Sequence, residues 1–294
     1  MLLIDDTTTT TDFEQQVARS ETIQYLDERI EGVASPCCCS KWERQEKKIM
    51  MNNEDDDLSE SLYERKSMFR EMGLLQFGRK REDSNGKCGG RKVNCWSDCG
   101  LIAIDLLGFG KSPKPRDCLY TLKDHVEMIE KSVVQPLHLG TFHLVAHSMG
   151  SVIALALAAK YHNCVKSITL VAPPYSSSEG NDVCLNALEK FAGKKLWPML
   201  SAGSSFMSCS MHNVICGGAK FMDSYLKILT KSRVRINVIQ GDKDQVVPRE
   251  CISKLKLKAP HAEINIIPNA DHSTVLLGRE KKFAQNLEHT WASC

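Results

Sequence analysis

The sequence lacks several features that would place it in a function class at once. It has no long hydrophobic run, no Cys-x-x-Cys pair, no Asn-x-Ser/Thr site and no histidine before His125. Its longest apolar stretch, residues 152–159, is followed by Lys160 and is much shorter than the roughly 18 residues of a membrane span. Without a Cys-x-x-Cys pair, the usual half of a zinc site is missing. These absences argue against a transmembrane span and against a structural zinc module.

Charge and composition exclude further classes. The formal net charge is only +2, so nucleic acid is not an expected partner. Hydrophobic residues make up 42% of the 294 residues, which is typical of a globular protein with a sizeable core. The thirteen cysteines are an odd number and fix no redox compartment. The start, MLLIDDTTTT, has neither the basic region nor the apolar region of a signal peptide, so none is visible.

The chain divides into two regions at about residue 100. Residues 1–100 are rich in threonine and acidic side chains, and their apolar periodicity is brief. We expect a poorly structured N-terminal region there, with short helices at 12–30 and 58–75. Residues 101–294 alternate between strand-like and helix-like patterns, which predicts one α/β domain.

The alternation in the second region predicts a mostly parallel sheet with helices on both faces. Strands are expected at 101–104, 142–146, 165–171, 234–240 and 262–267, and helices at 120–137, 149–161, 250–257 and 279–291. Thr121 is the expected N-cap of the first of these helices, and Pro136 lies near its end. The interval of about 173–232 has no strand period and carries helical patterns at 184–191 and 221–229. We expect this interval to form a helical cap.

The strongest chemical signal is the pentapeptide Ala-His-Ser-Met-Gly around Ser148, between a predicted strand and a predicted helix. A serine in such a sharp turn exposes its hydroxyl at the edge of the sheet, and small residues on either side let strand and helix approach. Ala146 stands where this motif usually has glycine. The backbone N–H of Met149, at the helix N-terminus, is the expected oxyanion donor.

A serine nucleophile needs a base and an acid that orients the base. Asp244 and His272 each follow the end of a predicted strand, and the chain order Ser, Asp, His is the one that α/β-hydrolases use. Asp242 and Asp271 are alternative acids. Asp244 is preferred because Gly-x-x-Asp-x-x-x-Pro frames it, and because Asp271 adjoins His272 and has little room to reach that imidazole. His147 is expected to pack in the turn and not to act as a base.

Three segments resemble one family of proteins. The segments IDLLGFGKSPKP (104–115), AHSMG (146–150) and LVAPPY (170–175) are similar to the plant BODYGUARD-like proteins, which are α/β-hydrolases described as probable lysophospholipases and tied to cuticle formation. The resemblance implies the catalytic triad Ser148, Asp244 and His272, with no metal or organic cofactor. It also implies a lipid or acyl ester substrate, peripheral contact with membranes and a place at the extracellular cell wall.

The chain departs from that family at one junction. The family has a strand ending in His-Gly, and the loop after it gives a second oxyanion donor. In this sequence Gly100 is followed directly by Leu101, and no His-Gly precedes it. We therefore expect the sheet to lack an N-terminal part. If nothing replaces the missing strand, two central strands lose their shared neighbour. Residues 74–78 are the only apolar run nearby that could substitute.

These observations predict a serine hydrolase of the α/β-hydrolase fold that acts on lipid-like carboxylic esters. Ser148 attacks, His272 transfers the proton, Asp244 orients the imidazole and the Met149 N–H binds the oxyanion. One alternative is an acyltransferase that uses the same acyl-enzyme. Another is a truncated variant without activity, because the His-Gly loop is absent.

Overall fold

The computed structural model describes residues 2–6, 100–110, 112–115, 118–175, 209–218 and 221–293. The helices predicted at 12–30, 58–75 and 184–191 lie outside the described residues, as does the apolar run 74–78. More than half of the interval 173–232 lies outside them too.

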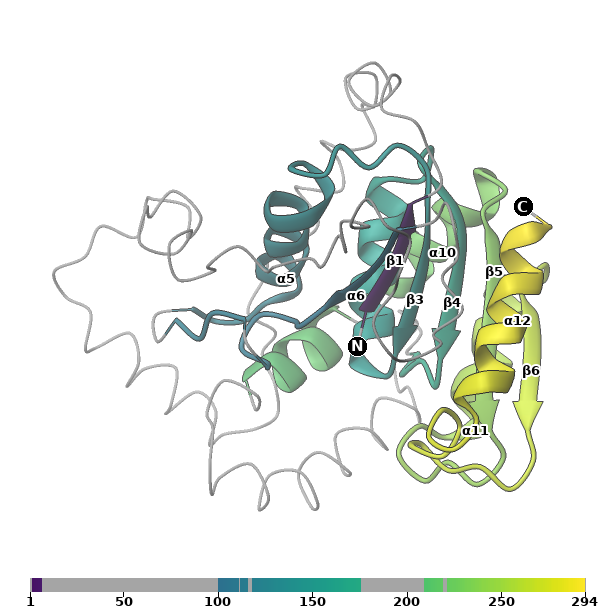
Figure 1. The fold of residues 1–294 in the computed structure, drawn as a ribbon. Coiled ribbons are helices and arrows are strands. Elements are labelled where there is room, and N and C mark those ends of the chain that lie inside the picture. Colours follow the sequence, from purple (N-terminus) through teal and green to yellow (C-terminus); the bar gives the residue numbers. More distant parts are fainter. Residues whose placement is uncertain are drawn as a thin grey trace, which may run out of the picture.

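Six strands form one mixed sheet in the order β2-β1-β3-β4-β5-β6 (Figure 1). They are β1 (Leu2–Asp6), β2 (Gly100–Ile104), β3 (Phe142–His147), β4 (Val165–Val171), β5 (Arg235–Gly241) and β6 (Glu263–Ile267). Strands β3 to β6 are parallel, whereas β1 is antiparallel to both of its neighbours. The five strands predicted from the alternation are all present, with ends within one residue of the predicted ones.

The missing strand has a replacement, because β1 lies between β2 and β3, so these two strands do not lose a shared neighbour. Leu2 is opposite Ile104 of β2 and Ala146 of β3, and Asp6 is opposite Gly100 and Phe142. A strand from the beginning of the chain thus occupies the gap, in the antiparallel direction (Figure 1). The backbone groups of β2 and β3 that would otherwise be unpaired therefore have a partner strand.

One face of the sheet carries the larger part of the core. Leu144, Ile168 and Val238 project from it into a cluster formed with the helices on that side. These are α5 (Leu122–Ile129), the π-helical turns η1 (Glu130–Val134) and η3 (His212–Gly218), α6 (Met149–Lys160), α10 (Met222–Lys231) and α11 (Arg249–Lys258). Every residue of α6 from Met149 to Ala159 is buried, and its many alanines let the helix lie close to the sheet.

The opposite face carries helix α12 (Glu280–Ala292) and a smaller core. Val171 and Ile239 of the sheet pack there with Val275 and with Phe283 of α12. This face is more polar than the first, since His143 and Ser167 lie on it, buried and hydrogen-bonded to each other. Helices therefore cover both faces, as the alternation predicted (Figure 1).

Local sequence explains where the first of these helices begins. Thr121 is the N-cap of α5: its hydroxyl accepts from the backbone N–H of Asp124, and the Asp124 carboxylate accepts from the backbone N–H of Thr121. The predicted N-cap is confirmed. The helix continues through η1 and ends in turns around Pro136, which has no N–H to donate to a further turn.

The interval predicted as a cap contains α10, which packs against α6 on the first face. Met222, Tyr225, Leu226 and Leu229 are buried and belong to the main core. Because its apolar side is part of that core, α10 belongs to the helical layer on the sheet and not to a separate cap.

Candidate active site

Ser148 lies in a strained turn between β3 and α6. Its φ of 56° and ψ of −129° are unusual for a residue with a side chain, and such strain persists only where neighbouring contacts impose it. The backbone N–H of Ser148 donates to the carbonyl of Val171 in β4 over 2.8 Å, and its carbonyl accepts from the N–H of Ser151. Ser151 also donates its hydroxyl to the carbonyl of Ala146. The strand-to-helix turn predicted from the pentapeptide is therefore present.

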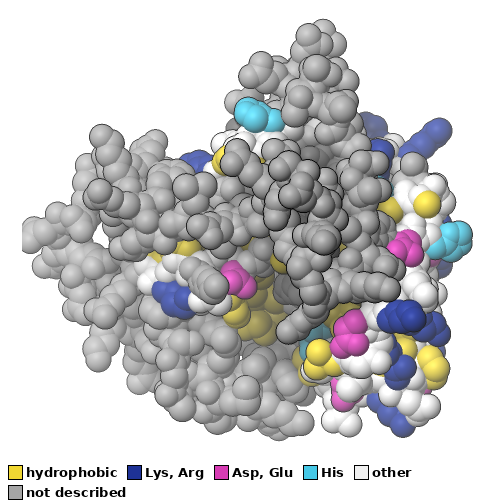
Figure 2. All heavy atoms as spheres, in the orientation of Figure 1, with side chains coloured by type: hydrophobic (Ala, Val, Ile, Leu, Met, Phe, Trp, Pro, Cys, Tyr) yellow, Lys and Arg dark blue, Asp and Glu magenta, His cyan; other side chains and the backbone are white. Residues whose placement is uncertain are grey.

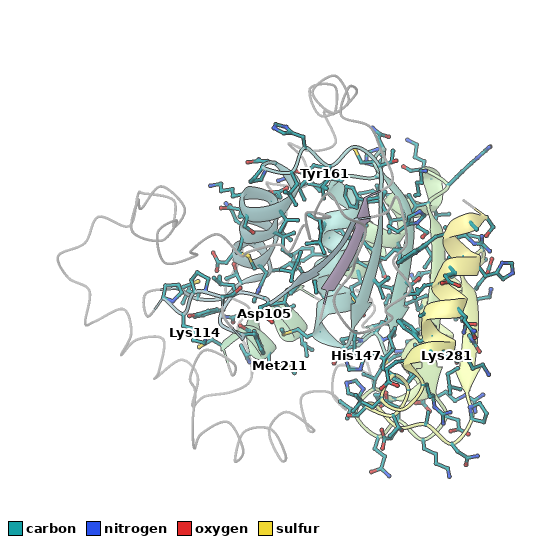
Figure 3. The ribbon with its side chains drawn as sticks, in the orientation of Figure 1. Asp105, Lys114, His147, Tyr161, Met211 and Lys281 are labelled. Carbon is teal, nitrogen blue, oxygen red and sulfur yellow. The ribbon has the colours of Figure 1, made fainter. Side chains whose placement is uncertain are left out.

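Residues from separate strands converge at one edge of the sheet. Figure 3 shows Asp105, which follows β2, and His147, at the end of β3, toward one end of the sheet, with Tyr161 toward the other. The loops after β5 and β6 reach the same edge, where the carboxyl ends of parallel strands place ligands. Gly241 lets these two loops meet, because a Cβ on it would lie 2.2 Å from the carbonyl oxygen of Ala270.

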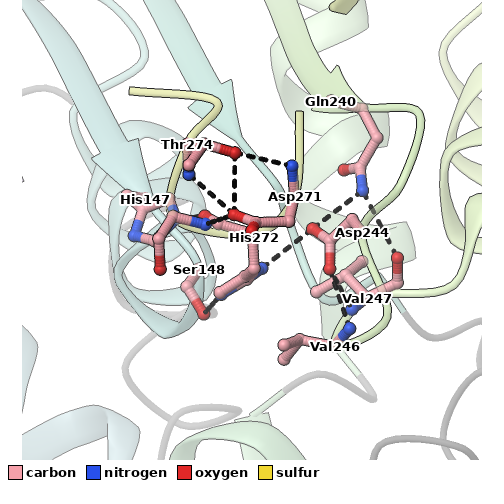
Figure 4. Close-up of polar contacts among 10 residues, drawn as sticks. His147, Ser148, Gln240, Asp244, Val246, Val247, Asp271, His272 and Thr274 are labelled. Carbon is pink, nitrogen blue, oxygen red and sulfur yellow. Dashed lines mark hydrogen bonds and ion pairs between the residues drawn. The ribbon is translucent and has the colours of Figure 1, made fainter. Parts of the chain in front are cut away.

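His272 lies between the serine and an aspartate (Figure 4). Its Nε2 is 2.9 Å from Oγ of Ser148, and its Nδ1 is 2.8 Å from Oδ2 of Asp244. A carboxylate oxygen only accepts, so Nδ1 carries the proton in this contact and Nε2 of the neutral ring faces the hydroxyl as an acceptor. This is the orientation in which the imidazole can take the serine proton.

Asp244 is a buried carboxylate with four N–H donors. Its side chain is 1% exposed. Oδ1 accepts from the backbone N–H groups of Val246 and Val247 at 2.8 and 2.9 Å, and Oδ2 accepts from His272 and from Nε2 of Gln240. Burial raises the pKa of Asp244, but the hydrogen bonds from His272, Val247 and Val246 outweigh it and hold the pKa below its ordinary value. The carboxylate therefore stays ionised at neutral pH.

The two alternative acids have other partners. Asp242 accepts from the backbone N–H of Ala270, and Asp271 accepts from the backbone N–H groups of Ser273 and Thr274 within its own loop. Both are exposed. The structure thus brings Asp244, and neither alternative, into contact with the imidazole.

His147 packs in the turn, as the sequence indicated. Its Nε2 lies 2.9 Å from the backbone carbonyl oxygen of His272, and the two imidazole rings are 4.7 Å apart (Figure 4). Burial lowers the pKa of His147 to about 4, so the ring is neutral near pH 7. The hydrogen bond of the His147 ring is to the backbone of the loop that carries His272.

The residue expected to bind the oxyanion is Met149. Met149 is the first residue of α6, where backbone N–H groups have no partner within the helix, and it directly follows Ser148. Among the described residues, no cluster of metal-ligating side chains occurs, and no helix is long and apolar enough to cross a bilayer.

Sequence reasoning missed the partners that surround Asp244. Gln240 continues the series Ile236 and Val238 on the buried side of β5, and a polar residue in such a series is a detectable signal. The backbone donors Val246 and Val247 follow Asp244 at the spacing at which an aspartate accepts from its own loop.

Comparisons with known proteins show which family the chain belongs to. A family model described as alpha/beta hydrolase fold matches residues 93–195. The chain is 37% identical to probable lysophospholipase BODYGUARD 4 of Arabidopsis thaliana, over 80% of this chain and 84% of that protein, and 36% identical to BODYGUARD 5, over 80% and 83%. Lipase 1 of Psychrobacter immobilis is 26% identical over 58% of this chain and 62% of its own length.

Solved structures are similar at lower identity. The meta-cleavage product hydrolase from Pseudomonas fluorescens IP01 is 18% identical, over 66% of this chain and 79% of its own, with a TM-score of 0.49.

The alignment with BODYGUARD 4 runs over 356 positions, more than the chain has residues, so that relative contains segments without a counterpart here. Because it is 37% and 36% identical to BODYGUARD 4 and BODYGUARD 5 over 80% of its length, the chain belongs to the BODYGUARD family of probable lysophospholipases, which are hydrolases of the alpha/beta hydrolase fold.

Proposed function

We propose that Ser148, His272 and Asp244 form the catalytic triad of a hydrolase that cleaves carboxylic esters of lipid-like molecules. The observation that carries the proposal is the unbroken path from Oγ of Ser148 through the imidazole to Oδ2 of Asp244, with contacts of 2.9 and 2.8 Å. The names of the relatives, lysophospholipases and lipases, support the substrate class.

The geometry supports a two-step reaction. Oγ of Ser148 attacks the acyl carbonyl while Nε2 of His272 takes its proton, and the ionised Asp244 stabilises the imidazolium that results. The N–H of Met149 donates to the oxyanion. Collapse breaks the ester bond, and the imidazolium gives its proton to the leaving alcohol. A water molecule, deprotonated by the same imidazole, then releases the fatty acid and restores Ser148.

We further propose that the protein meets its substrate at a lipid surface. Leu277 is 64% exposed on the loop that carries His272, and the exposed Lys281 and Lys282 follow it at the start of α12. Figure 2 shows hydrophobic and basic side chains over this end of the molecule, with acidic side chains among them. An exposed leucine beside basic side chains suits the boundary between acyl chains and headgroups.

Fatty-acid release from lysophosphatidylcholine and from a short-chain nitrophenyl ester tests the proposed function. We expect the wild type to cleave both, and Ser148→Ala to lose about 10⁴-fold or more in turnover. Leu277→Asp should slow the reaction on micelles and not on the monomeric ester, whereas Leu257→Asp, on the exposed side of α11, should change neither. A folded wild type that cleaves no ester would support the inactive alternative, and transfer of the acyl group to an added alcohol would support an acyltransferase.

A further inference from the structure

Gln240 is a buried amide next to the proposed triad. It is the penultimate residue of β5, is 1% exposed and lies on the face that Ile236 and Val238 share. A buried amide is costly unless it makes hydrogen bonds. Its contacts therefore reveal what the residue does at this position.

The amide nitrogen of Gln240 has two acceptors. It lies 3.0 Å from Oδ2 of Asp244 and 3.3 Å from the carbonyl oxygen of Val247 (Figure 4). Neither partner can donate, so the nitrogen and not the oxygen of the amide must face them. The two N–H bonds of one amide group thus connect the acid to the loop that carries it.

The two contacts act on both carboxylate oxygens. Gln240 donates directly to Oδ2, the oxygen that faces His272. It also holds Val247, whose own N–H donates to Oδ1 at 2.9 Å. In the described part of the chain, two side chains donate to the Asp244 carboxylate, and these are His272 and Gln240. The backbone N–H groups of Val246 and Val247 hold Oδ1, and the amide of Gln240 holds Oδ2, so together they limit the rotation of the carboxylate about its Cβ–Cγ bond.

We propose that Gln240 is a positioning residue, which holds Oδ2 of Asp244 in line with Nδ1 of His272 so that the carboxylate can stabilise the imidazolium. The inference rests on the proposed function and adds to it a residue that touches neither substrate nor the serine. Without the amide, Oδ2 of Asp244 keeps His272 but loses its second donor, and its position relative to the imidazole becomes less fixed. The protonated imidazole then loses part of its stabilisation.

The charges around the imidazole make this effect measurable. Asp244 faces His272 from the loop after β5, His147 faces it from β3, and Asp271 precedes it in its own loop. His147 is neutral above about pH 4, so it contributes no change of charge at higher pH. Among these neighbours, Asp244 is the one in hydrogen-bond contact with the ring.

The test is the pH dependence of the Ser148 reaction with a fluorophosphonate in Gln240→Met, which removes the donor at similar volume. We expect the rate at high pH to fall roughly tenfold and the midpoint of the acid limb to move about half a pH unit lower. The midpoint should also move to lower pH in Asp244→Asn, and by more than in Gln240→Met. Gln245→Met, an exposed glutamine of the same loop, is the matched control and should keep both values. The midpoint is independent of the folded fraction only where that fraction does not change with pH, so circular dichroism of each variant is measured at every pH and the rates are divided by the folded fraction.

The double variant Gln240→Met with Asp244→Asn completes the cycle. If Gln240 acts through the carboxylate, its substitution should have little further effect once the carboxylate is gone. An acid limb in Gln240→Met that is unmoved or moves to higher pH overturns the proposal, and so does an undiminished effect in the double variant. A wild type whose labelling does not depend on Ser148 contradicts the proposed function instead.

Discussion

The imidazole of His147 donates from Nε2 to the backbone carbonyl of His272 across 2.9 Å, although 125 residues separate them in the sequence. The carbonyl can only accept, so Nε2 of His147 carries the proton. Through this bond the residue before Ser148 holds the loop that carries His272. The serine and the histidine are therefore held together by a contact that takes no part in proton transfer.

Replacing His147 by phenylalanine should keep the ring packing and lose the bond. We expect turnover to fall roughly tenfold, since a loosened histidine loop shifts the imidazole away from Oγ of Ser148. Because His147 is already neutral above about pH 4, the pH profile between pH 5 and 8 should keep its shape. Ester turnover against pH measures both effects. A turnover equal to that of the wild type would show that the bond does not position the base.

The choice between the carboxylates can be tested by a matched pair. Asp244→Asn should lower turnover by about 10³ to 10⁴-fold, because the amide cannot stabilise the imidazolium. Asp242→Asn should change turnover less than about twofold, because Asp242 is exposed and its side chain accepts from the backbone N–H of Ala270 and not from His272. Asp242→Asn should unfold near the wild-type temperature, whereas Asp244→Asn should unfold at a lower temperature, because its amide nitrogen cannot accept the hydrogen bonds that the buried carboxylate accepts. A harmful Asp242→Asn with a harmless Asp244→Asn would reverse the assignment.

Much of this site follows from local sequence. The turn around Ser148 and the strand ends before Asp244 and His272 are each set by short patterns, and the chain order supplies the rest. Gln240 was missed because its importance depends on a contact with a loop that the strand pattern does not describe. The pentapeptide Leu2–Asp6 was missed for a different reason. Its partners β2 and β3 lie far along the chain, and two of its five residues are acidic, so no periodicity marks it as a central strand.

Proline at Ile4 tests the role of that strand. Ile4 pairs with Ile102 on one side and with Leu144 on the other, and proline in a central strand cannot donate to the ladder and is confined to edge strands in known sheets. We expect Ile4→Pro to lower the thermal unfolding midpoint strongly and to reduce activity. Circular dichroism during heating measures the midpoint. Unchanged unfolding of Ile4→Pro would show that the sheet does not depend on β1.

His125 of α5 should make the fold sensitive to acid. It is fully buried, neither ring nitrogen has a hydrogen-bond partner among the described residues, and burial lowers its pKa from 6.5 to about 3. Below pH 6.5 the unfolded chain takes up a proton that the folded chain does not, so this residue lowers the free energy of unfolding as the pH falls toward 3.

His125→Leu should therefore raise the unfolding midpoint by several degrees, and by more at pH 5 than at pH 8. The exposed His289 is the control, and His289→Gln should leave both midpoints unchanged. Thermal scans at the two pH values decide the point. An equal or smaller gain at pH 5 would mean that His125 is protonated in the folded protein.

The most direct measurement is the site at which a fluorophosphonate attaches to the 294-residue chain. The strained turn, the imidazole 2.9 Å from Oγ and the helix N-terminus at Met149 all act on a single hydroxyl. Mass spectrometry of the labelled and digested protein should place one adduct on Ser148, and Ser148→Ala should carry none while still unfolding cooperatively. An adduct on another serine, or labelling that persists in Ser148→Ala, would contradict the assignment of the nucleophile.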